Sequence, residues 1–306
     1  MTFELNGVAE LPHLGVVLVQ GDDAASFLHG QLTQDFALLG LDQARLAGYC
    51  SPKGRMLATF IGFKRSPTDI VLIGSRDLLG PMIKRLSMFV MRSKVKLSDA
   101  SAEVQLRGIA GPPLAALTAG QALAPWARRD LGQAQLVGLY PAKGVERALW
   151  VAPAGTPLPQ GPAMSADLWS WTEVRSGVAT VTAPLTEAFV PQMLNYESIG
   201  GVSFKKGCYP GQEVVARSQF RGTLKRRAML MHSAVPLTVG DELFDAHEPG
   251  QSCATVVQVA PSPAGGFDAI VSGQAEVLQN RPIHHLRAQG PELTLLELPY
   301  PLLEDI

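Results

Sequence analysis

The sequence has few cysteines, almost no net charge and no long apolar run. Its three cysteines, Cys50, Cys208 and Cys253, stand far apart in 306 residues. This excludes a disulfide framework and fits a reducing compartment. No C-x-x-C pair occurs, so we expect no metal or iron–sulfur site held by this chain alone. A formal net charge of −1 provides no overall field for nucleic acid or membranes, so any such attraction needs a local patch.

Two further absences concern membranes and export. No stretch of about 18 uninterrupted apolar residues occurs, so no membrane span is predicted. Residues 1–4 lack the basic start and apolar core of a signal peptide. We therefore expect a cytoplasmic protein with no membrane partner. The composition, 46% apolar and 17% charged, is typical of a globular chain, and its length favours about two domains.

The N-terminal two thirds of the chain mix strand and helix patterns. The apolar runs with strand character are residues 15–19, 45–50, 55–64 and 70–73. Residues 77–92 carry apolar side chains at helical spacing. Ser165 is expected to cap a second helix that ends at Arg175, with Gly177 as its stop signal. These patterns predict an α+β arrangement.

The pattern changes beyond Arg226, where short β-rich runs separated by turns dominate. The runs are residues 228–232, 242–245, 254–259, 269–272, 276–278 and 293–298. This predicts a small barrel or sandwich after a domain boundary near Arg226. We interpret His284 and His285 as part of a surface turn, since two adjacent histidines without further ligands seldom form a metal site.

The most distinctive chemical feature is a thiol in a glycine-rich, basic setting. Pro210 suits the first turn of a helix, so Cys208 is expected just before or at its N-terminus, where backbone N–H groups favour a thiolate. Lys205 and Lys206 add positive charge. The alternative is an inert buried cysteine, which is the usual state of a free cysteine. Cys50 and Cys253 lie in strand patterns and are predicted to be inert.

Two other features have both ordinary and functional explanations. Seven basic residues fall within 23 positions, with Glu213 the only acid among them: Lys205, Lys206, Arg217, Arg221, Lys225, Arg226 and Arg227. They form either a solvated basic face or a site for a phosphate or carboxylate ligand. Trp169 and Trp171 point to different sides of their helix, so either both are core residues or one stacks on a flat heterocycle.

Several segments together resemble a known family. They are residues 189–195, FVPQMLN, residues 200–217, GGVSFKKGCYPGQEVVAR, residues 27–35, FLHGQLTQD, and residues 298–300. The sequence is similar to the YgfZ-type folate-binding proteins, whose K-G-C-Y-x-G-Q-E motif is complete at residues 206–213. That family is linked to iron–sulfur cluster assembly or repair and to tRNA modification. It shares its fold with the aminomethyltransferase (T protein) of the glycine cleavage system.

The resemblance implies an α+β fold of intertwined domains around a central folate channel, followed by a C-terminal β-barrel. The implied folate-binding domain comprises residues 1–48 and 125–225, the inserted α+β domain residues 49–124, and the barrel residues 226–306. The implied cofactor is tetrahydrofolate or a one-carbon derivative. The implied partners are iron–sulfur enzymes or their assembly proteins, with direct tRNA contact as a further possibility.

The resemblance also implies roles for individual residues. Cys208 would act as a redox or transfer thiol, supported by Lys206 and Glu213. The remaining motif residues are Gly207, Tyr209, Gly211 and Gln212. The residues expected at the cofactor are Trp169, Arg175, Gln192, Asn195, Arg221 and Arg226, with Trp169 against the ring system and the last two near the glutamate tail. No residue is expected to bind a metal.

The sequence departs from the T-protein pattern at two positions. The T-protein aspartate that orients the reactive folate nitrogen corresponds to Ala58 or Thr59, and its pterin-binding glutamate corresponds to Arg175. Neither Ala58 nor Thr59 holds a charge, and arginine only donates hydrogen bonds. We therefore favour a folate-dependent accessory protein for iron–sulfur enzymes. The alternatives are a folate-dependent one-carbon transferase and a non-enzymatic adaptor for tRNA or protein.

Overall fold

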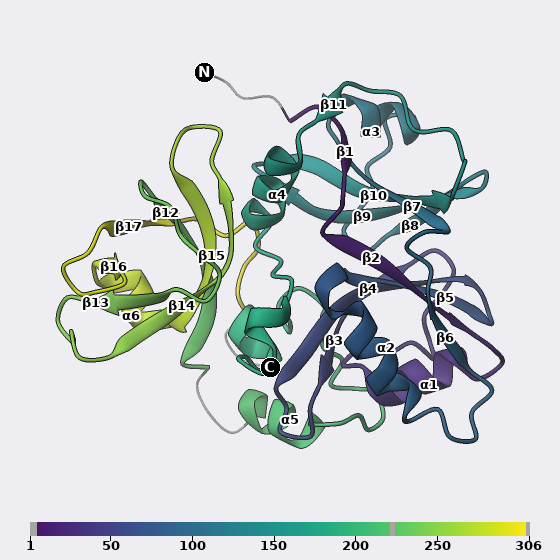
Figure 1. Ribbon diagram of the computed structural model, residues 1–306, viewed down its shortest axis with the longest axis horizontal. Coiled ribbons are helices and arrows are strands. Elements are labelled where there is room, and N and C mark those ends of the chain that lie inside the picture. The colour runs from purple at the N-terminus through teal and green to yellow at the C-terminus, as the bar shows by residue number, and fades with distance from the viewer. Residues whose placement is uncertain (1–4, 221–223, 304–306) are drawn as a thin grey trace.

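The computed structural model describes residues 5–220 and 224–303, which form two open sheets and one closed barrel (Figure 1). The first sheet has five antiparallel strands. Their order is β3 (Ala44–Cys50), β4 (Met56–Ser66), β5 (Asp69–Ser75), β2 (Leu14–Gln20) and β6 (Lys96–Asp99). Its helices are α1 (Ala24–Gln31) and α2 (Leu79–Ser87). Strands β2 and β3 are buried along almost their whole length, as expected for strands covered on both faces.

The second sheet has six strands, of which only β1 and β11 run parallel to each other. Their order is β11 (Ala163–Met164), β1 (Gly7–Glu10), β7 (Val104–Ala110), β10 (Val145–Pro153), β9 (Ala134–Ala142) and β8 (Arg128–Leu131). Helix α3 (Pro112–Leu117) lies beside β1, β7 and β10. The chain passes from this sheet to the first and back, and residues of both sheets share one hydrophobic core.

Helix α4 (Ala166–Arg175) begins and ends where the sequence predicts. The Ser165 hydroxyl accepts a hydrogen bond from the Leu168 amide at 3.2 Å, and Gly177 leaves the helix with a φ of +66°, which glycine adopts at little cost. The helix contacts β14 and β15 of the barrel on one side and β9 on the other. It therefore joins the barrel to the two-sheet body (Figure 1).

The β-rich runs predict a small barrel or sandwich, and the C-terminal part forms a closed barrel. Its order is β12 (Arg226–Ser233), β15 (Phe267–Gln274), β14 (Ser252–Pro261), β13 (Glu242–Asp245), β16 (Ile283–His285) and β17 (Glu292–Leu296). Two local predictions are wrong. Residues 276–278 belong to helix α6 (Ala275–Asn280), because so short an apolar run does not distinguish strand from helix. His284 and His285 lie in β16, where the His285 ring pairs with Asp241 at 2.6 Å.

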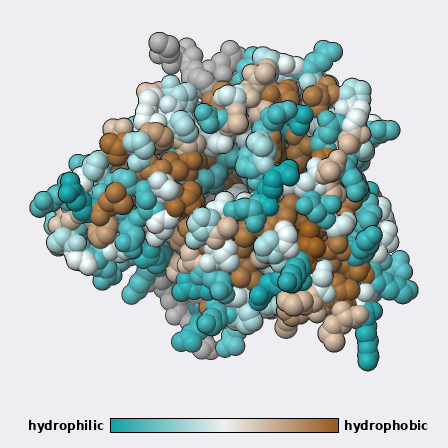
Figure 2. All heavy atoms as spheres, viewed as in Figure 1, coloured by the Kyte–Doolittle hydropathy of each residue, from teal (hydrophilic) through white to brown (hydrophobic). Residues whose placement is uncertain are grey.

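The surface is mixed in polarity. Figure 2 shows apolar atoms reaching the surface where β2, β4 and α2 lie in Figure 1, with hydrophilic side chains around them. Exposed apolar side chains that follow α2 are Met88, Phe89 and Met91. Within residues 5–220 and 224–303, no helix combines the length and the apolarity that crossing a lipid bilayer requires.

Candidate functional site

A small cavity lies between the two sheets of the body. Both sheets contribute to its wall, as do α4 and the segments around Thr180 and Tyr196. The lining residues are Leu14, Leu46, Thr59, Phe60, Ile61, Ile73, Gly74, Leu139, Leu149, Glu173, Val178, Thr180 and Tyr196. The cavity volume is about 50 Å³, well below the roughly 300–1,000 Å³ of most small-molecule sites.

Glu173 is the single carboxylate among these lining residues, and its position is set by its neighbours. The indole Nε1 of Trp169 donates to its Oε1 at 3.0 Å, and the ring of His13 lies 3.0 Å from its Oε2. Burial alone would lower the pKa of His13, but the hydrogen bond and charge of Glu173 outweigh burial and raise it. Burial lowers the pKa of the nearby buried Arg147 to about 10, against the opposing effect of the Glu173 charge.

The two cofactor residues predicted on α4 point in different directions. Trp169 is fully buried against Gly108 of β7, with the guanidinium of Arg147 5.1 Å from its ring centre. Arg175 turns toward the barrel, where its Nη1 lies 3.4 Å from Asp268 of β15. On this helix the side chain that reaches the cavity is therefore Glu173. It lies two residues before Arg175, the position that the resemblance matched to the pterin-binding glutamate of the T protein.

The lysine of the K-G-C-Y-x-G-Q-E motif binds the C-terminal end of α1. Lys206 is buried, and its Nζ donates to the carbonyl oxygens of His29 and Leu32, the latter at 3.1 Å. The same ammonium lies 4.5 Å from the ring centre of Tyr209. Burial is the largest effect on its pKa and lowers it to about 8. The lysine therefore holds the loop on both sides of the cysteine.

The glycine of the motif at position 211 makes a second contact, with the turn between β3 and β4. Gly211 has a φ of +80°, and a Cβ there would stand 2.4 Å from the carbonyl oxygen of Ser51 and 2.6 Å from the backbone of Gly54. Only glycine allows this close approach. The turn therefore docks on the loop just before α5 (Gln212–Phe220), where Gln212 is half-buried and Glu213 is exposed.

Cys208 is exposed, whereas Cys50 and Cys253 are buried. Burial raises the pKa of the Cys50 thiol to about 12, as expected for an inert thiol. Cys208 is not among the residues that line the central cavity. Strand β3 runs from Leu46 at the cavity to Cys50, and the carbonyl oxygen of the next residue, Ser51, lies against Gly211 of the motif. At about 3.3 Å per residue along a strand, Cys50 therefore lies roughly 13 Å from Leu46.

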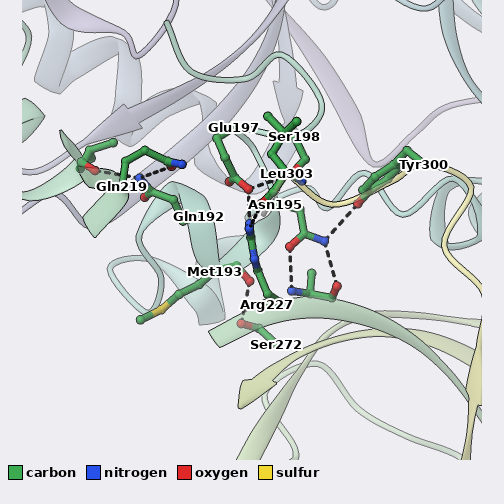
Figure 3. Close-up of polar contacts among 12 residues, drawn as sticks. Gln192, Met193, Asn195, Glu197, Ser198, Gln219, Arg227, Ser272, Tyr300 and Leu303 are labelled. Carbon is green, nitrogen blue, oxygen red and sulfur yellow. Dashed lines mark hydrogen bonds and ion pairs between the residues drawn. The ribbon is translucent and has the colours of Figure 1, made fainter. Parts of the chain in front are cut away.

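Gln192 and Asn195 connect parts of the chain rather than face the cavity (Figure 3). The Gln192 side-chain amide donates to the Val215 carbonyl of α5 at 2.7 Å. Asn195 exchanges two hydrogen bonds with the backbone of Ala228 in β12, at 2.8 and 3.1 Å. Arg226 lies 3.4 Å from the Ser272 carbonyl oxygen. A cofactor role for these residues stays a prediction, and Arg221 lies outside the described residues.

The basic run is not one continuous solvated face. Lys206 is buried in the motif, and Arg227 is buried in an ion pair with Glu197. Lys205, Arg217 and Lys225 are exposed. A spacing argument along the sequence cannot separate these two groups, because burial of a cation depends on a partner that is distant in the chain.

The sequence analysis missed two polar side-chain pairs, one at the cavity and one beside the motif. Glu173 and His13 meet at the cavity, and His29 and Asp35 meet beside the motif with 3.0 Å between Nδ1 and Oδ1. The quoted segment of residues 27–35 contains the second pair, so its resemblance to the family was the only available signal. The first pair joins positions 160 residues apart and carries no local signal.

The comparisons with known proteins agree on family and fold. The chain is 26% identical over 302 residues to the tRNA-modifying protein YgfZ of Serratia proteamaculans, covering 95% of this chain and 91% of that protein. It is 34% identical over 217 residues to YgfZ of Enterobacter sp. strain 638, covering 68% and 66% of the two chains. No family model matches the sequence.

The fold is that of a solved aminomethyltransferase. The crystal structure of aminomethyltransferase T of the glycine cleavage system from Bartonella henselae superposes with a TM-score of 0.68 at 17% identity, covering 99% of this chain and 88% of that chain. This confirms the predicted α+β fold with its C-terminal barrel. From its sequence similarity over most of its length, the chain belongs to the family of the tRNA-modifying protein YgfZ.

Proposed function

We propose that this protein binds tetrahydrofolate between its two sheets and supports tRNA modification by iron–sulfur enzymes through the Cys208 thiol. The observation that carries the folate part is the Glu173 carboxylate in an otherwise largely apolar cavity between the sheets. A pterin presents amino and ring N–H donors, and a carboxylate is an acceptor that suits them. Phe60, Ile61 and Leu149 provide apolar surface for a flat ring.

The residues fit the chemistry of a pterin, but the volume requires movement. A cavity of about 50 Å³ does not enclose a folate ring system, so binding must displace wall side chains outward. Tetrahydrofolate, when bound, would supply a one-carbon carrier or a reductant. Glu173, oriented by Trp169 and His13, would fix the ring, while the exposed Cys208 stands outside the cavity.

The cavity favours an accessory role over aminomethyl transfer. Thr59 lines the cavity, and its hydroxyl accepts a hydrogen bond from the Val181 amide at 3.1 Å. The neighbouring Ala58 is buried and apolar. Neither provides the negative charge that would orient a reactive folate nitrogen. We therefore expect no steady formation of methylene-tetrahydrofolate from an aminomethyl donor.

Calorimetric titration with tetrahydrofolate tests the binding part. Glu173→Gln keeps the size of the side chain and removes its charge, so affinity is expected to fall by roughly 10- to 100-fold, the value of one charged hydrogen bond. Glu146→Gln, which alters an exposed carboxylate outside the cavity, is the matched control. Equal affinity of the Glu173→Gln and wild-type proteins would show that folate does not bind at this cavity.

Complementation tests the thiol. In cells lacking their own homologue, the wild-type protein is expected to restore tRNA modification by iron–sulfur enzymes, measured by mass spectrometry of tRNA nucleosides. Cys208→Ala is expected to fail, whereas Cys253→Ala, which changes a buried cysteine, is expected to succeed. Full restoration by Cys208→Ala would remove the thiol from the proposal and leave folate binding untouched.

A further inference from the structure

A histidine and an aspartate are held together beside the motif. The His29 Nδ1, in the last turn of α1, lies 3.0 Å from Oδ1 of Asp35. The same carboxylate accepts a hydrogen bond from the Leu38 amide at 2.9 Å. Burial would raise the pKa of Asp35, but the amide of Leu38 and the ring of His29 outweigh burial and lower it. Asp35 is therefore a carboxylate at neutral pH.

This pairing fixes which nitrogen of His29 carries the proton. A carboxylate at Nδ1 holds the proton on that nitrogen and leaves Nε2 with its lone pair, as in other carboxylate-oriented histidines. The Nε2 atom faces the motif, because it would stand 3.4 Å from a Cβ built on Gly207. The lone pair is thus presented to the residue immediately before Cys208.

Gly207 has a different role from the other motif glycine. Unlike Gly211, it does not adopt a positive φ, so its backbone does not need glycine. A Cβ at this position would touch the His29 ring without a severe clash. The absence of a side chain therefore leaves the space beside Nε2 free at the residue that precedes Cys208.

Lys206 holds the segment around Cys208 against the end of α1. Lys206 donates to the carbonyl oxygen of His29 itself, and its ammonium lies over the ring of Tyr209. The charge of a Cys208 thiolate acts to raise the pKa of Lys206, although burial lowers it overall. The exposed thiol therefore directly follows a glycine that lies beside the His29 ring, in a segment whose Lys206 and Tyr209 are held in place.

We propose that His29, oriented by Asp35, is the proton acceptor for the Cys208 thiol. The proposal rests on the proposed role of that thiol. In this step the S–H bond breaks, the proton moves to Nε2 of His29, and the electron pair stays on sulfur. Nothing is oxidised or reduced. Asp35 neutralises the imidazolium that forms, and the product is a thiolate–imidazolium pair able to attack an electrophile.

Among the described residues, two charged groups contact His29. Asp35 lies at Nδ1 of the ring, and Lys206 binds the backbone carbonyl oxygen, while Lys64 adds a positive charge near Asp35. Lys206 keeps a positive charge near the thiol at neutral pH, but its two hydrogen bonds run to carbonyl oxygens. It therefore stabilises a thiolate without accepting its proton.

The test is the rate of Cys208 alkylation by iodoacetamide from pH 6 to 9.5, measured by mass spectrometry on the full chain without folate or tRNA. Failure of folate binding therefore leaves this result unaffected. His29→Gln is expected to lower the rate at pH 6.5 by about tenfold or more. The rates should converge above pH 9, where solvent hydroxide ionises the thiol in either protein. Asp35→Asn should show part of the loss, and His247→Gln, an exposed histidine on the barrel, none.

Two results would overturn the proposal. One is an unchanged rate in His29→Gln at every pH, and the other is a uniform decrease that persists at pH 9.5, which would show a purely structural role. Labelling of the buried Cys50 reports whether a variant has unfolded. If His29→Gln unfolds, Gly207→Ala decides, because its added methyl group would lie against Nε2 and hinder proton transfer to it. The rate of Cys208 alkylation in Gly207→Ala should then be lower than in wild type at pH 6.5 and equal to it above pH 9. A pH profile identical to that of wild type would refute the proposal.

Discussion

The ion pair between Arg227 and Glu197 joins the first barrel strand to the body, and its removal should be costly (Figure 3). Both side chains are at least 95% buried. Arg227 also donates to the carbonyl oxygen of Leu303 at 2.5 Å, and the Ser198 hydroxyl donates to the carboxylate at 2.8 Å. Removing one partner of such a pair leaves an uncompensated buried charge, which costs about 3–5 kcal/mol.

We expect Arg227→Met to lower the free energy of unfolding by about 3 kcal/mol, at the low end because Ser198 still donates to Glu197. Glu197→Gln leaves the guanidinium with the Leu303 carbonyl and should cost about 2–3 kcal/mol. The double variant buries no isolated charge. Its cost should be smaller than the sum of the single costs by about 2 kcal/mol.

Urea denaturation followed by tryptophan fluorescence and circular dichroism measures these values. All four tryptophans precede the barrel in sequence, and Trp171 donates to Asp268 of β15 at 2.8 Å, so its signal reports on the junction. Circular dichroism reports on the whole fold. Strictly additive single costs, or an Arg227→Met cost below about 1 kcal/mol, would show that the pair is not coupled as its burial requires.

Three further predictions concern the cavity and the motif. Because folding raises the pKa of His13, its protonated ring stabilises the folded protein. This contribution is fully present below pH 6.5 and is lost as the pH rises through the pKa of the folded state. His13→Gln should therefore lower the melting temperature more at pH 5.5 than at pH 8.5. The pKa of Lys206 falls to about 8 from 10.5, so the unfolded chain binds more protons between these values and this residue's contribution to stability rises with pH. The melting-temperature difference between wild type and Lys206→Met should shift in favour of wild type from pH 8 to pH 9.5, and a constant difference would contradict the assignment. Gly211→Ala should cost at least about 1–2 kcal/mol, because alanine disfavours its φ and its Cβ meets the backbone of the 51–54 turn; equal urea midpoints for Gly211→Ala and Gly207→Ala would show that this close contact is absent.

The local signals in the sequence predicted much of the architecture. The Ser165 cap and the Gly177 stop predicted the limits of α4, and short β-rich runs with turns predicted a small barrel or sandwich beyond Arg226, where the structure has the barrel. These features depend on side chains a few residues apart, so they are visible in a single sequence. The motif at residues 206–213 likewise indicated the family directly.

The tertiary structure alone decided which polar side chains reach which site. On α4, Glu173 faces the cavity and Arg175 faces Asp268, a choice that depends on which side of the helix the barrel covers. The contact of Lys206 with His29 joins residues 177 positions apart. Such pairings depend on the packing of distant strands and helices, and no periodicity within one segment encodes them. The sequence by itself therefore determined the elements and the family, and the packing of those elements determined the geometry of the site.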